Sequence, residues 1–467
     1  MEPTRISCHL SVLQGSSLRF SSAPIFKITA TSADGRLNKW EDISYSQFAA
    51  DIELVAKYWH KTLSLHSVGL GSVVGLLLSG WSYTDVVQIY GVSRAGYVPQ
   101  LFSLQLPNPD AIFELLAKGD AKALICDRSS IGVVQDAPIP VYSTTDPLDI
   151  GARMADIPLP AIEIHGHADN VMMIFHTSGS TSGSPKVIPY LQRWIIGAIK
   201  KAEIVCRPKR TVCSDVTTWI GSICHIGQTF MFLGYMQHGA CTILPSRQAF
   251  TSEELNNMIT FAGLNRLSNY LQLDELFYIG SELGSSEKEW AYSKGLRLKA
   301  SFSRSSSKRH WDVFKPTEGV ACDFSPIEST SNGKFLLELI VLQESIDCPP
   351  PSLCSSDGHY HTGDFFEEII SGHYVYRGHN DDWIKCKSGL RCDAKFIEDQ
   401  VKSVCGSLVL DCIVIRHGRP SPVLILEPLM PEVDQERLKQ DIYNRIQPLQ
   451  ARCYLHERIE AQAIIVA

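Results

Sequence analysis

The chain has 467 residues, of which 44% are hydrophobic and 20% are charged, so it can bury a large core and form more than one domain or subdomain. Its formal net charge of −7 is spread along the sequence without a basic patch, which argues against a nucleic-acid partner. We expect no membrane partner, because no uninterrupted apolar run reaches about 18 residues and the N-terminus lacks the hydrophobic segment of a signal peptide.

The 14 cysteines are scattered singly through apolar segments. No Cys-x-x-Cys pair occurs, which argues against a zinc site. We therefore expect buried free thiols. Because thiols stay reduced in the cytoplasm, we expect a cytoplasmic protein.

The first part of the chain predicts helices that alternate with short apolar strands. Ser and Asp capping candidates open the segment 40–62, and a helical stripe follows through Phe48, Ile52, Val55, Ala56 and Trp59. Further helices are expected at 86–96 and 110–120, and strands at 72–79 and 122–126. This alternation predicts a parallel sheet that is covered on both faces.

Residues 171–175 form an apolar run typical of a buried strand, and a loop rich in hydroxyl groups follows directly. Nine of the ten residues from Thr177 to Lys186 are Ser, Thr, Gly or Pro. Glycines let backbone N–H groups approach phosphate oxygens, hydroxyls donate further hydrogen bonds, and the lysine adds a positive charge. The loop is not a Walker loop, because Val187 follows the lysine and cannot hold magnesium. We predict a nucleoside triphosphate site; the alternative is a Gly/Ser linker, which rarely adjoins an apolar strand.

The remaining elements predict a second α/β unit at about 171–330 and then short strands with glycine turns, typical of a small barrel-like layer. A compact α+β tail begins at about residue 381. The predicted fold class is therefore α/β: a large N-terminal domain, 1–380, contains two parallel-sheet subdomains and the small β-barrel-like layer. A small C-terminal α+β domain, 381–467, follows.

A second polar motif, Tyr360-His361-Thr362-Gly363-Asp364, stands where a strand meets a turn. A carboxylate in such a place can accept hydrogen bonds from both hydroxyls of a ribose. Taken alone, Asp364 would fit an ordinary glycine turn better than a ribose site. Its position after the loop and before a third motif at 377–391 favours the ribose role.

The segment TSGSTSGSPK at 177–186 resembles the signature loop of the adenylate-forming superfamily, which contains acyl-CoA synthetases, luciferases and the adenylation domains of nonribosomal peptide synthetases. The extra serine, Ser182, resembles the variant found in fungal synthetase-like carboxylic acid reductases. The segments 360–364 and 377–391 resemble later motifs of the superfamily in the same order. The resemblance implies that a carboxylate and ATP give an acyl-adenylate and pyrophosphate. The acyl group then passes to a pantetheine thiol of CoA or of a carrier-protein domain.

The resemblance also implies roles for individual residues. Lys186, His225 and Arg391 are the expected catalytic residues; His225, with Trp219, is expected near the wall that faces the carboxylate substrate, and Arg391 on the thioester-forming surface of the small domain. Asp381 is expected to be the hinge of that domain. For His225, a core histidine bonded to the backbone is an equally good interpretation. The expected nucleotide contacts come from Thr177, Ser178, Gly179, Ser180, Thr181, Gly183, Lys186, Ser305, Asp364 and His379.

The sequence departs from the superfamily pattern at several positions. His379 replaces an arginine that contacts ribose or phosphate, and a histidine is mostly neutral at pH 7. Ser305 can supply the hydroxyl of the usual Thr-Glu motif, but Ser306 cannot replace its magnesium-binding glutamate. The segment 246–280 is short, and the sequence stops at Ala467 before the expected terminal lysine, so we expect an incomplete small domain.

These departures leave three hypotheses. The first is a weakened enzyme that adenylates a small carboxylic acid with ATP and Mg²⁺, for which no metal ligand is assigned. The second is an inactive, truncated remnant that still binds nucleotide. The third is a stand-alone acyl-CoA ligase. The sequence does not identify the acid, because the segments that would line its site are shortened or altered.

Overall fold

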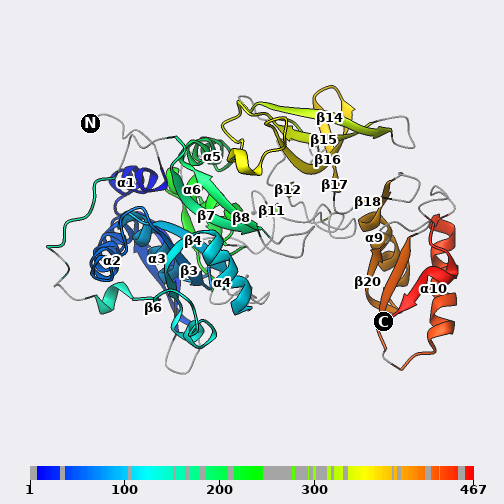
Figure 1. Cartoon of the computed structure of the whole chain (residues 1–467), viewed down its shortest axis with the longest axis horizontal. Helices are drawn as coiled ribbons and strands as arrows, with labels where there is room; N and C mark the ends of the chain where they lie inside the picture. The colour runs from blue at the N-terminus through cyan, green and yellow to red at the C-terminus, as the bar shows by residue number, and fades with distance from the viewer. Residues whose placement is uncertain are drawn as a thin grey trace. The chain divides into compact units, whose positions relative to one another are not determined.

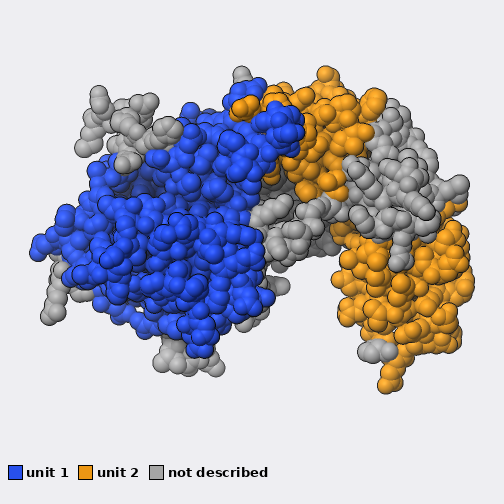
Figure 2. All heavy atoms as spheres, in the orientation of Figure 1, with its two compact units in different colours: residues 1–299, 344–358 blue, residues 300–343, 359–467 orange. Residues whose placement is uncertain are grey.

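The structure is a computed structural model of the whole chain (Figure 1). It describes residues 8–31, 37–103, 108–150, 154, 156–162, 168–177, 186–208, 215–219, 221–245, 276–278, 293, 298–300, 313–316, 320–329, 335–380, 383–385, 391–415, 422–430, 432–450 and 458–467. The chain divides into two compact units, which Figure 2 shows in blue and orange. Unit 1 contains 1–299 and 344–358, and unit 2 contains 300–343 and 359–467.

The larger sheet of unit 1 has six strands in the order β6-β5-β3-β4-β7-β8. These strands are β3 (Val73–Leu78), β4 (Val98–Ser103), β5 (Ala121–Cys126), β6 (Val141–Ser143), β7 (Val171–Thr177) and β8 (Lys186–Leu191). All neighbours are parallel except β7 and β8. Residues 74–78 of β3 and 123–126 of β5 are buried, as the continuous apolar runs predict for a covered parallel sheet.

The predicted helices of this region are confirmed, with sharper boundaries. They are α2 (Tyr45–Leu65), α3 (Tyr83–Arg94) and α4 (Pro109–Lys118). The hydroxyl of Ser44 caps α2 by accepting the N–H of Gln47, and the five apolar stripe residues of this helix are all buried. The caps of α3 and α4 are Ser82 and Asn108.

The second sheet of unit 1 has the order β2-β1-β10-β9 and combines distant parts of the chain. It contains β1 (Pro24–Thr31), β2 (Leu37–Ser44), β9 (Val216–Thr218) and β10 (Cys241–Ile243). Phe26 of β1 is opposite Thr242 of β10. The helices α1 (His9–Arg19), α5 (Gln192–Val205) and α6 (Ile226–Gln237) also belong to this unit. Its aromatic core includes the fully buried Phe26, which stacks on Phe232.

The α/β class with two sheets is confirmed. The two sheets, however, do not follow one another along the chain as expected, because each contains strands from both parts. β7 and β8 join the first sheet, although the second unit was expected to begin there. The N-terminal strands β1 and β2 join the second sheet. The physical reason is that the pairing of strands distant in sequence follows the shared core, which local sequence patterns do not reveal.

Unit 2 contains an antiparallel sheet in the order β13-β17-β16-β15-β14. Its strands are β13 (Val313–Phe314), β14 (Cys322–Ser329), β15 (Phe335–Val341), β16 (Tyr360–Ile370) and β17 (His373–His379). Within the described residues this sheet is open, with β13 and β14 at its edges, so the expected barrel-like layer is not a closed barrel. Closure requires the two edge strands to pair, and β13 has only two residues.

The remainder of unit 2 is the α+β tail. It contains β18 (Trp383–Lys385), β19 (Arg391–Asp393), α9 (Ala394–Cys405), β20 (Val409–Ile415), β21 (Val423–Pro428), α10 (Gln435–Gln450) and β22 (Ile464–Val466). Its core packs Ile397 and Val401 of α9 and Ile442 of α10 with Leu424 of the sheet β20-β21-β22. The domain boundary at 380/381 stays a prediction. Across the described ranges, no helix is long and apolar enough to cross a membrane.

Candidate functional site

The strands β7 and β8 hold the two ends of the predicted phosphate loop. Their antiparallel pairing places the backbone of Thr177 opposite that of Lys186, so the chain leaves the sheet and re-enters it at one place. This place is at the carboxyl end of β7, at the same sheet edge as the carboxyl ends of β3 and β4. Ligands of open α/β sheets bind outside this edge. The predicted contacts Ser178, Gly179, Ser180, Thr181 and Gly183 lie outside the described residues.

His176, the residue before Thr177, is fixed in one tautomer. Its Nδ1 lies 2.9 Å from the carbonyl oxygen of Leu101, so Nδ1 carries the proton and donates it. Its Nε2 then accepts a hydrogen bond from Nε2 of Gln100 at 3.1 Å. Burial lowers the pKa of His176 to about 4, so the ring is neutral at pH 7. The sequence analysis did not single out His176 as a residue that fixes the start of the loop. The only sign of this role in the sequence is a histidine at the end of an apolar strand.

A buried carboxylate organises the turn between β3 and α3 at the same sheet edge. Asp85 is 1% exposed and accepts a hydrogen bond from the hydroxyl of Ser79, as well as from the backbone N–H groups of residues 80–82. Asp127, after β5, accepts the N–H of Ser79 at 3.2 Å. Burial, and then the charge of Asp85, raises the pKa of Asp127 to about 6.

His225 is the N-cap residue of α6. Its Nδ1 accepts the N–H of Gly227 at 3.1 Å, so the proton of the neutral ring is on Nε2, which can donate a hydrogen bond. Partial burial lowers the pKa of His225. The ring is therefore a neutral donor, and its predicted role toward a carboxylate stays a prediction. Trp219, by contrast, is 1% exposed and packs against Phe26 and Phe232 in the core.

In unit 2, Asp364 and His379 are brought together as cross-strand neighbours on β16 and β17. Tyr376 Oη donates a hydrogen bond to Asp364 Oδ1 at 3.3 Å. Nε2 of His379 lies 3.2 Å from the carbonyl oxygen of Thr362, so it donates to the motif that contains Asp364. Gly363 has a φ of +74°, and a Cβ on it would lie 2.8 Å from His379 Nε2. The motif therefore needs glycine for both its backbone angle and its close neighbour.

Glu338 of β15 supports this motif, although sequence reasoning did not single it out. Its two carboxylate oxygens lie 3.1 Å from His361 Nδ1 and 3.1 Å from the backbone nitrogen of Gly363. The hydroxyl of Thr362 donates to the carbonyl oxygen of Leu339 at 2.8 Å, where the strand register shifts. These side chains replace regular strand pairing at the glycine turn. A single charge within the apolar segment 335–341 was the signal in the sequence.

Three further predicted site residues lie in parts of the chain with little or no description. Arg391 opens β19, and its backbone is opposite Lys385. Asp381 and Ser305 lie outside the described residues, so the hinge and the serine contact stay predictions. In the described ranges, no group of three or more His, Cys, Asp or Glu side chains is arranged to hold a metal ion.

A mostly parallel α/β sheet with a Gly- and Ser-rich loop at the carboxyl end of a strand defines a nucleotide-binding class of fold. The family model described as "AMP-binding enzyme" matches residues 25–278, and the model "AMP-binding enzyme C-terminal domain" matches residues 381–467. The chain belongs to the AMP-binding enzyme family, whose members form acyl-adenylates.

Similar proteins cover nearly the full chain. The AMP-binding domain-containing enzyme iboA of Amanita muscaria (strain Koide BX008) is 30% identical over 98% of this chain and 96% of its own length. The o-succinylbenzoate CoA synthetase MenE of Bacillus subtilis, solved with an acyl-adenylate intermediate, has a TM-score of 0.72 at 14% identity and covers 98% of this chain and 94% of its own. The same synthetase has been solved with ATP and a magnesium ion.

A third similar protein is the adenylation domain of a carboxylic acid reductase from Segniliparus rugosus, solved with AMP and a co-purified carboxylic acid. Its TM-score is 0.71 at 14% identity, over 98% of this chain and 88% of its own. At this level of identity the two solved proteins support the fold alone.

Proposed function

We propose that the protein uses ATP to convert a small carboxylic acid to an acyl-adenylate, at a reduced rate, and that the acyl group passes to a pantetheine thiol of CoA or a carrier-protein domain. The observation that carries this proposal is the β7–β8 pairing, which joins the ends of a Ser- and Gly-rich loop at the carboxyl end of a parallel sheet in an AMP-binding enzyme. A cytoplasmic location, expected from the scattered cysteines, is part of the same proposal.

The proposed nucleotide contacts divide into two groups. Loop N–H groups and Lys186 would hold the phosphates, and the carboxylate of Asp364, oriented by Tyr376, would accept hydrogen bonds from the ribose. The stabilisation is electrostatic, because phosphoryl and adenylyl oxygens carry the developing charge. No described residue is assigned to magnesium, and Ser306 stands where the superfamily has a metal-binding glutamate. We therefore assign no step to the metal.

The reduced rate rests on the replaced side chains. His379 offers an imidazole that already donates to Thr362, where the superfamily has a guanidinium with a permanent charge. Loss of one group that stabilises transition-state charge typically costs about 100- to 1000-fold in rate. This observation also favours a second candidate, a protein that binds nucleotide without turnover. A stand-alone acyl-CoA ligase remains the third candidate.

Trapping acyl-adenylates with hydroxylamine separates these candidates. The full chain is incubated with ATP, Mg²⁺ and a panel of aryl, amino and α-keto acids, and hydroxamate and pyrophosphate are measured. We expect slow, acid-dependent formation of both products, reduced by a further factor of about 10 to 100 in Asp364→Asn. Lys122→Ala, a change at an exposed lysine paired with Asp120, is the control for Lys186→Ala.

The outcomes assign the candidates directly. Nucleotide binding without product for any acid supports the second candidate and contradicts adenylation. Product that forms only when CoA is added, and appears as acyl-CoA, supports the third. Equal rates in Lys186→Ala and Lys122→Ala would show that the loop lysine has no part in the reaction.

A further inference from the structure

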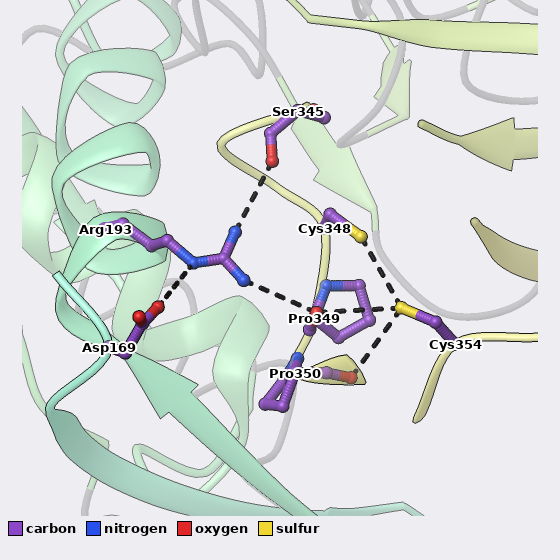
Figure 3. A network of polar contacts seen from close by, with 7 residues as sticks. All are labelled: Asp169, Arg193, Ser345, Cys348, Pro349, Pro350 and Cys354. Carbon is purple, nitrogen blue, oxygen red and sulfur yellow. Dashed lines mark hydrogen bonds and ion pairs between the residues drawn. The ribbon is translucent and has the colours of Figure 1, made fainter. Parts of the chain in front are cut away.

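The segment 344–358, which connects β15 to β16, is fastened to α5 of unit 1. The side chain of Ile346 packs so closely on Gly197 that a Cβ there would lie 3.0 Å from it. Lys201 forms an ion pair with Asp347. The guanidinium of Arg193 donates to the carbonyl oxygens of Ser345 at 3.5 Å and Pro349 at 3.4 Å (Figure 3). The segment is thus held at several points on one helix.

Two cysteines face each other within this fastened segment. Sγ of Cys348 lies 3.6 Å from Sγ of Cys354, and Figure 3 shows the two sulfur atoms pointing toward one another. Cys354 Sγ also lies 3.8 Å from the carbonyl oxygen of Pro349 and 3.7 Å from that of Pro350. The thiol hydrogen of Cys354 can therefore point to a carbonyl group while that of Cys348 points to Cys354.

The turn between the two cysteines holds their backbones in place. Three consecutive prolines, 349–351, restrict φ to the region near −65°. The short 3₁₀ helix η5 (Pro351–Leu353) follows, and the N–H of Cys354 donates to the carbonyl oxygen of Pro351 at 3.1 Å. The N–H of Cys348 donates to the carbonyl oxygen of Ser345 at 3.0 Å. Little conformational freedom is therefore left to lose when the two sulfur atoms join.

We propose that Cys348 and Cys354 form an oxidisable dithiol that closes to an intramolecular disulfide in reaction with small disulfides such as oxidised glutathione. A disulfide bond has a length of about 2.05 Å, so the sulfur atoms must approach by only about 1.6 Å. A change of side-chain torsions in this turn supplies such a movement. The inference does not depend on the proposed adenylation activity.

The order of the two steps follows from exposure. Cys348 is 3% exposed, whereas Cys354 is partly exposed and can meet a reagent. The thiolate of Cys354 attacks one sulfur of glutathione disulfide, which forms a mixed disulfide and releases one glutathione thiolate. The sulfur of Cys348 then attacks Cys354 Sγ, gives its proton to solvent and releases the second glutathione. Two protein thiols are oxidised and one glutathione disulfide is reduced. Burial, and then the hydrogen bond with Cys354, raises the pKa of Cys348, which slows the second step at neutral pH.

Peptide mapping tests the proposal. The folded full chain is incubated with oxidised glutathione, unreacted thiols are blocked with iodoacetamide, and the protein is digested with trypsin. Both cysteines fall in one peptide, 335–377, because Lys334 and Arg377 are the flanking cleavage sites. We expect this peptide to be unalkylated and lighter by two hydrogen atoms than its reduced form. Addition of dithiothreitol should restore two alkylation sites.

Single variants give the discriminating result. Cys348→Ser should accumulate the glutathione adduct on Cys354, whereas Cys354→Ser should leave Cys348 unmodified because it is buried. The control Cys322→Ser, at another partly exposed cysteine, should still form the disulfide. In the unsubstituted protein, the disulfide should raise Tm by a few degrees, and circular dichroism of each variant checks that it folds.

Two results would overturn the proposal. One is a stable glutathione adduct on Cys354 of the unsubstituted protein, with Cys348 still open to alkylation after denaturation. The other is full alkylation of both cysteines after denaturation, following oxidation that modifies Cys322 in the same sample. Either result would mean that the two sulfur atoms do not join.

Discussion

At the residue scale, the motif around Asp364 depends on one backbone angle and one close contact. Gly363 and Gly372 both have positive φ, of +74° and +70°, but their surroundings differ. A Cβ on Gly363 would meet His379, whereas nothing lies within 4 Å of a Cβ on Gly372. The two glycines therefore separate the cost of the backbone angle from the cost of the contact.

We predict that Gly363→Ala destabilises the protein more than Gly372→Ala. In each variant the left-handed conformation of alanine costs about 1–2 kcal/mol. In Gly363→Ala, the new Cβ also pushes His379 away from the carbonyl oxygen of Thr362. The excess should be at least about 1 kcal/mol in the free energy of unfolding, measured with urea. It should disappear when both glycine variants are compared in a His379→Ala background; an excess that persists there would contradict the contact as its cause.

Asp127 gives a prediction on pH. Because its pKa is raised to about 6, the folded protein binds this proton more tightly than the unfolded chain, whose pKa is near 3.8. The stabilisation from this group is full below about pH 4 and is lost as the pH rises through about 6. Asp127→Asn lacks this dependence and keeps an oxygen for the N–H of Ser79. Between pH 4 and 6, the free energy of unfolding of the unsubstituted protein should fall by about 1–2 kcal/mol relative to that of the variant, allowing for solvent screening.

Thermal unfolding of both proteins from pH 4 to 8 measures this difference. The matched control is Asp149→Asn, because Asp149 is exposed and its ion pair with Arg128 is long, at 3.6 Å. That variant should follow the unsubstituted protein at every pH. A difference between Asp127→Asn and the unsubstituted protein that stays constant with pH would contradict the raised pKa.

At the element scale, β15 and β16 show how a strand pair accommodates the glycine turn before Asp364. The register shifts between Glu338 and Ile340, and the side chains of Glu338 and Thr362 supply the hydrogen bonds that the regular ladder loses. Glu368 makes a similar bond, at 2.7 Å, to the N–H of Gly372 in an exposed turn of the same sheet. Both glutamates thus accept a hydrogen bond from a glycine N–H, but Glu338 is partly buried and Glu368 is exposed.

We predict that Glu338→Ala costs about 1–3 kcal/mol, whereas Glu368→Ala costs less than about 1 kcal/mol. The first change leaves the N–H of Gly363 without an acceptor in a partly buried place, and water replaces the acceptor in the second. Unfolding in urea measures both. Glu338→Gln keeps an acceptor but not the charge that attracts His361, so its cost should be intermediate. Equal costs for the two alanine variants would argue against this role of Glu338.

The local elements follow from sequence far better than their partners do. The helices predicted at 86–96 and 110–120 are found as α3 and α4, because apolar periodicity is a local pattern. The motif containing Asp364 can be recognised in the sequence, but its dependence on Glu338 cannot. The hydrogen bond from the N–H of Gly363 to Glu338 joins two strands whose register shifts at this place. The roles of all the predicted site residues stay predictions, and residues 178–185, Ser305 and Asp381 also lie outside the described residues.

At the scale of the whole molecule, nucleotide binding should stabilise the folded protein by RT ln(1 + [ATP]/Kd), which rises with the logarithm of the nucleotide concentration. ATP at about ten times its Kd should add about 1.4 kcal/mol, seen as a rise in Tm of about 1–3 °C. Inorganic triphosphate should give a smaller rise, because it has no ribose for Asp364. In Asp364→Asn the two ligands should become alike. No rise at millimolar ATP would contradict nucleotide binding.

The order of the strands in the second sheet also affects how the protein is made. The parallel partner of β1, strand β10, lies about 200 residues later, so a ribosome adding about 5–20 residues per second needs about 10–40 s to supply it. During that time β1 has only β2 beside it, and Ile25 and Phe26, which are 1% and 0% exposed in the finished protein, lack the strand β10. The N-terminal hairpin β1–β2 therefore lacks its parallel partner during much of synthesis, and slow elongation before residue 241 should lower the yield of folded protein.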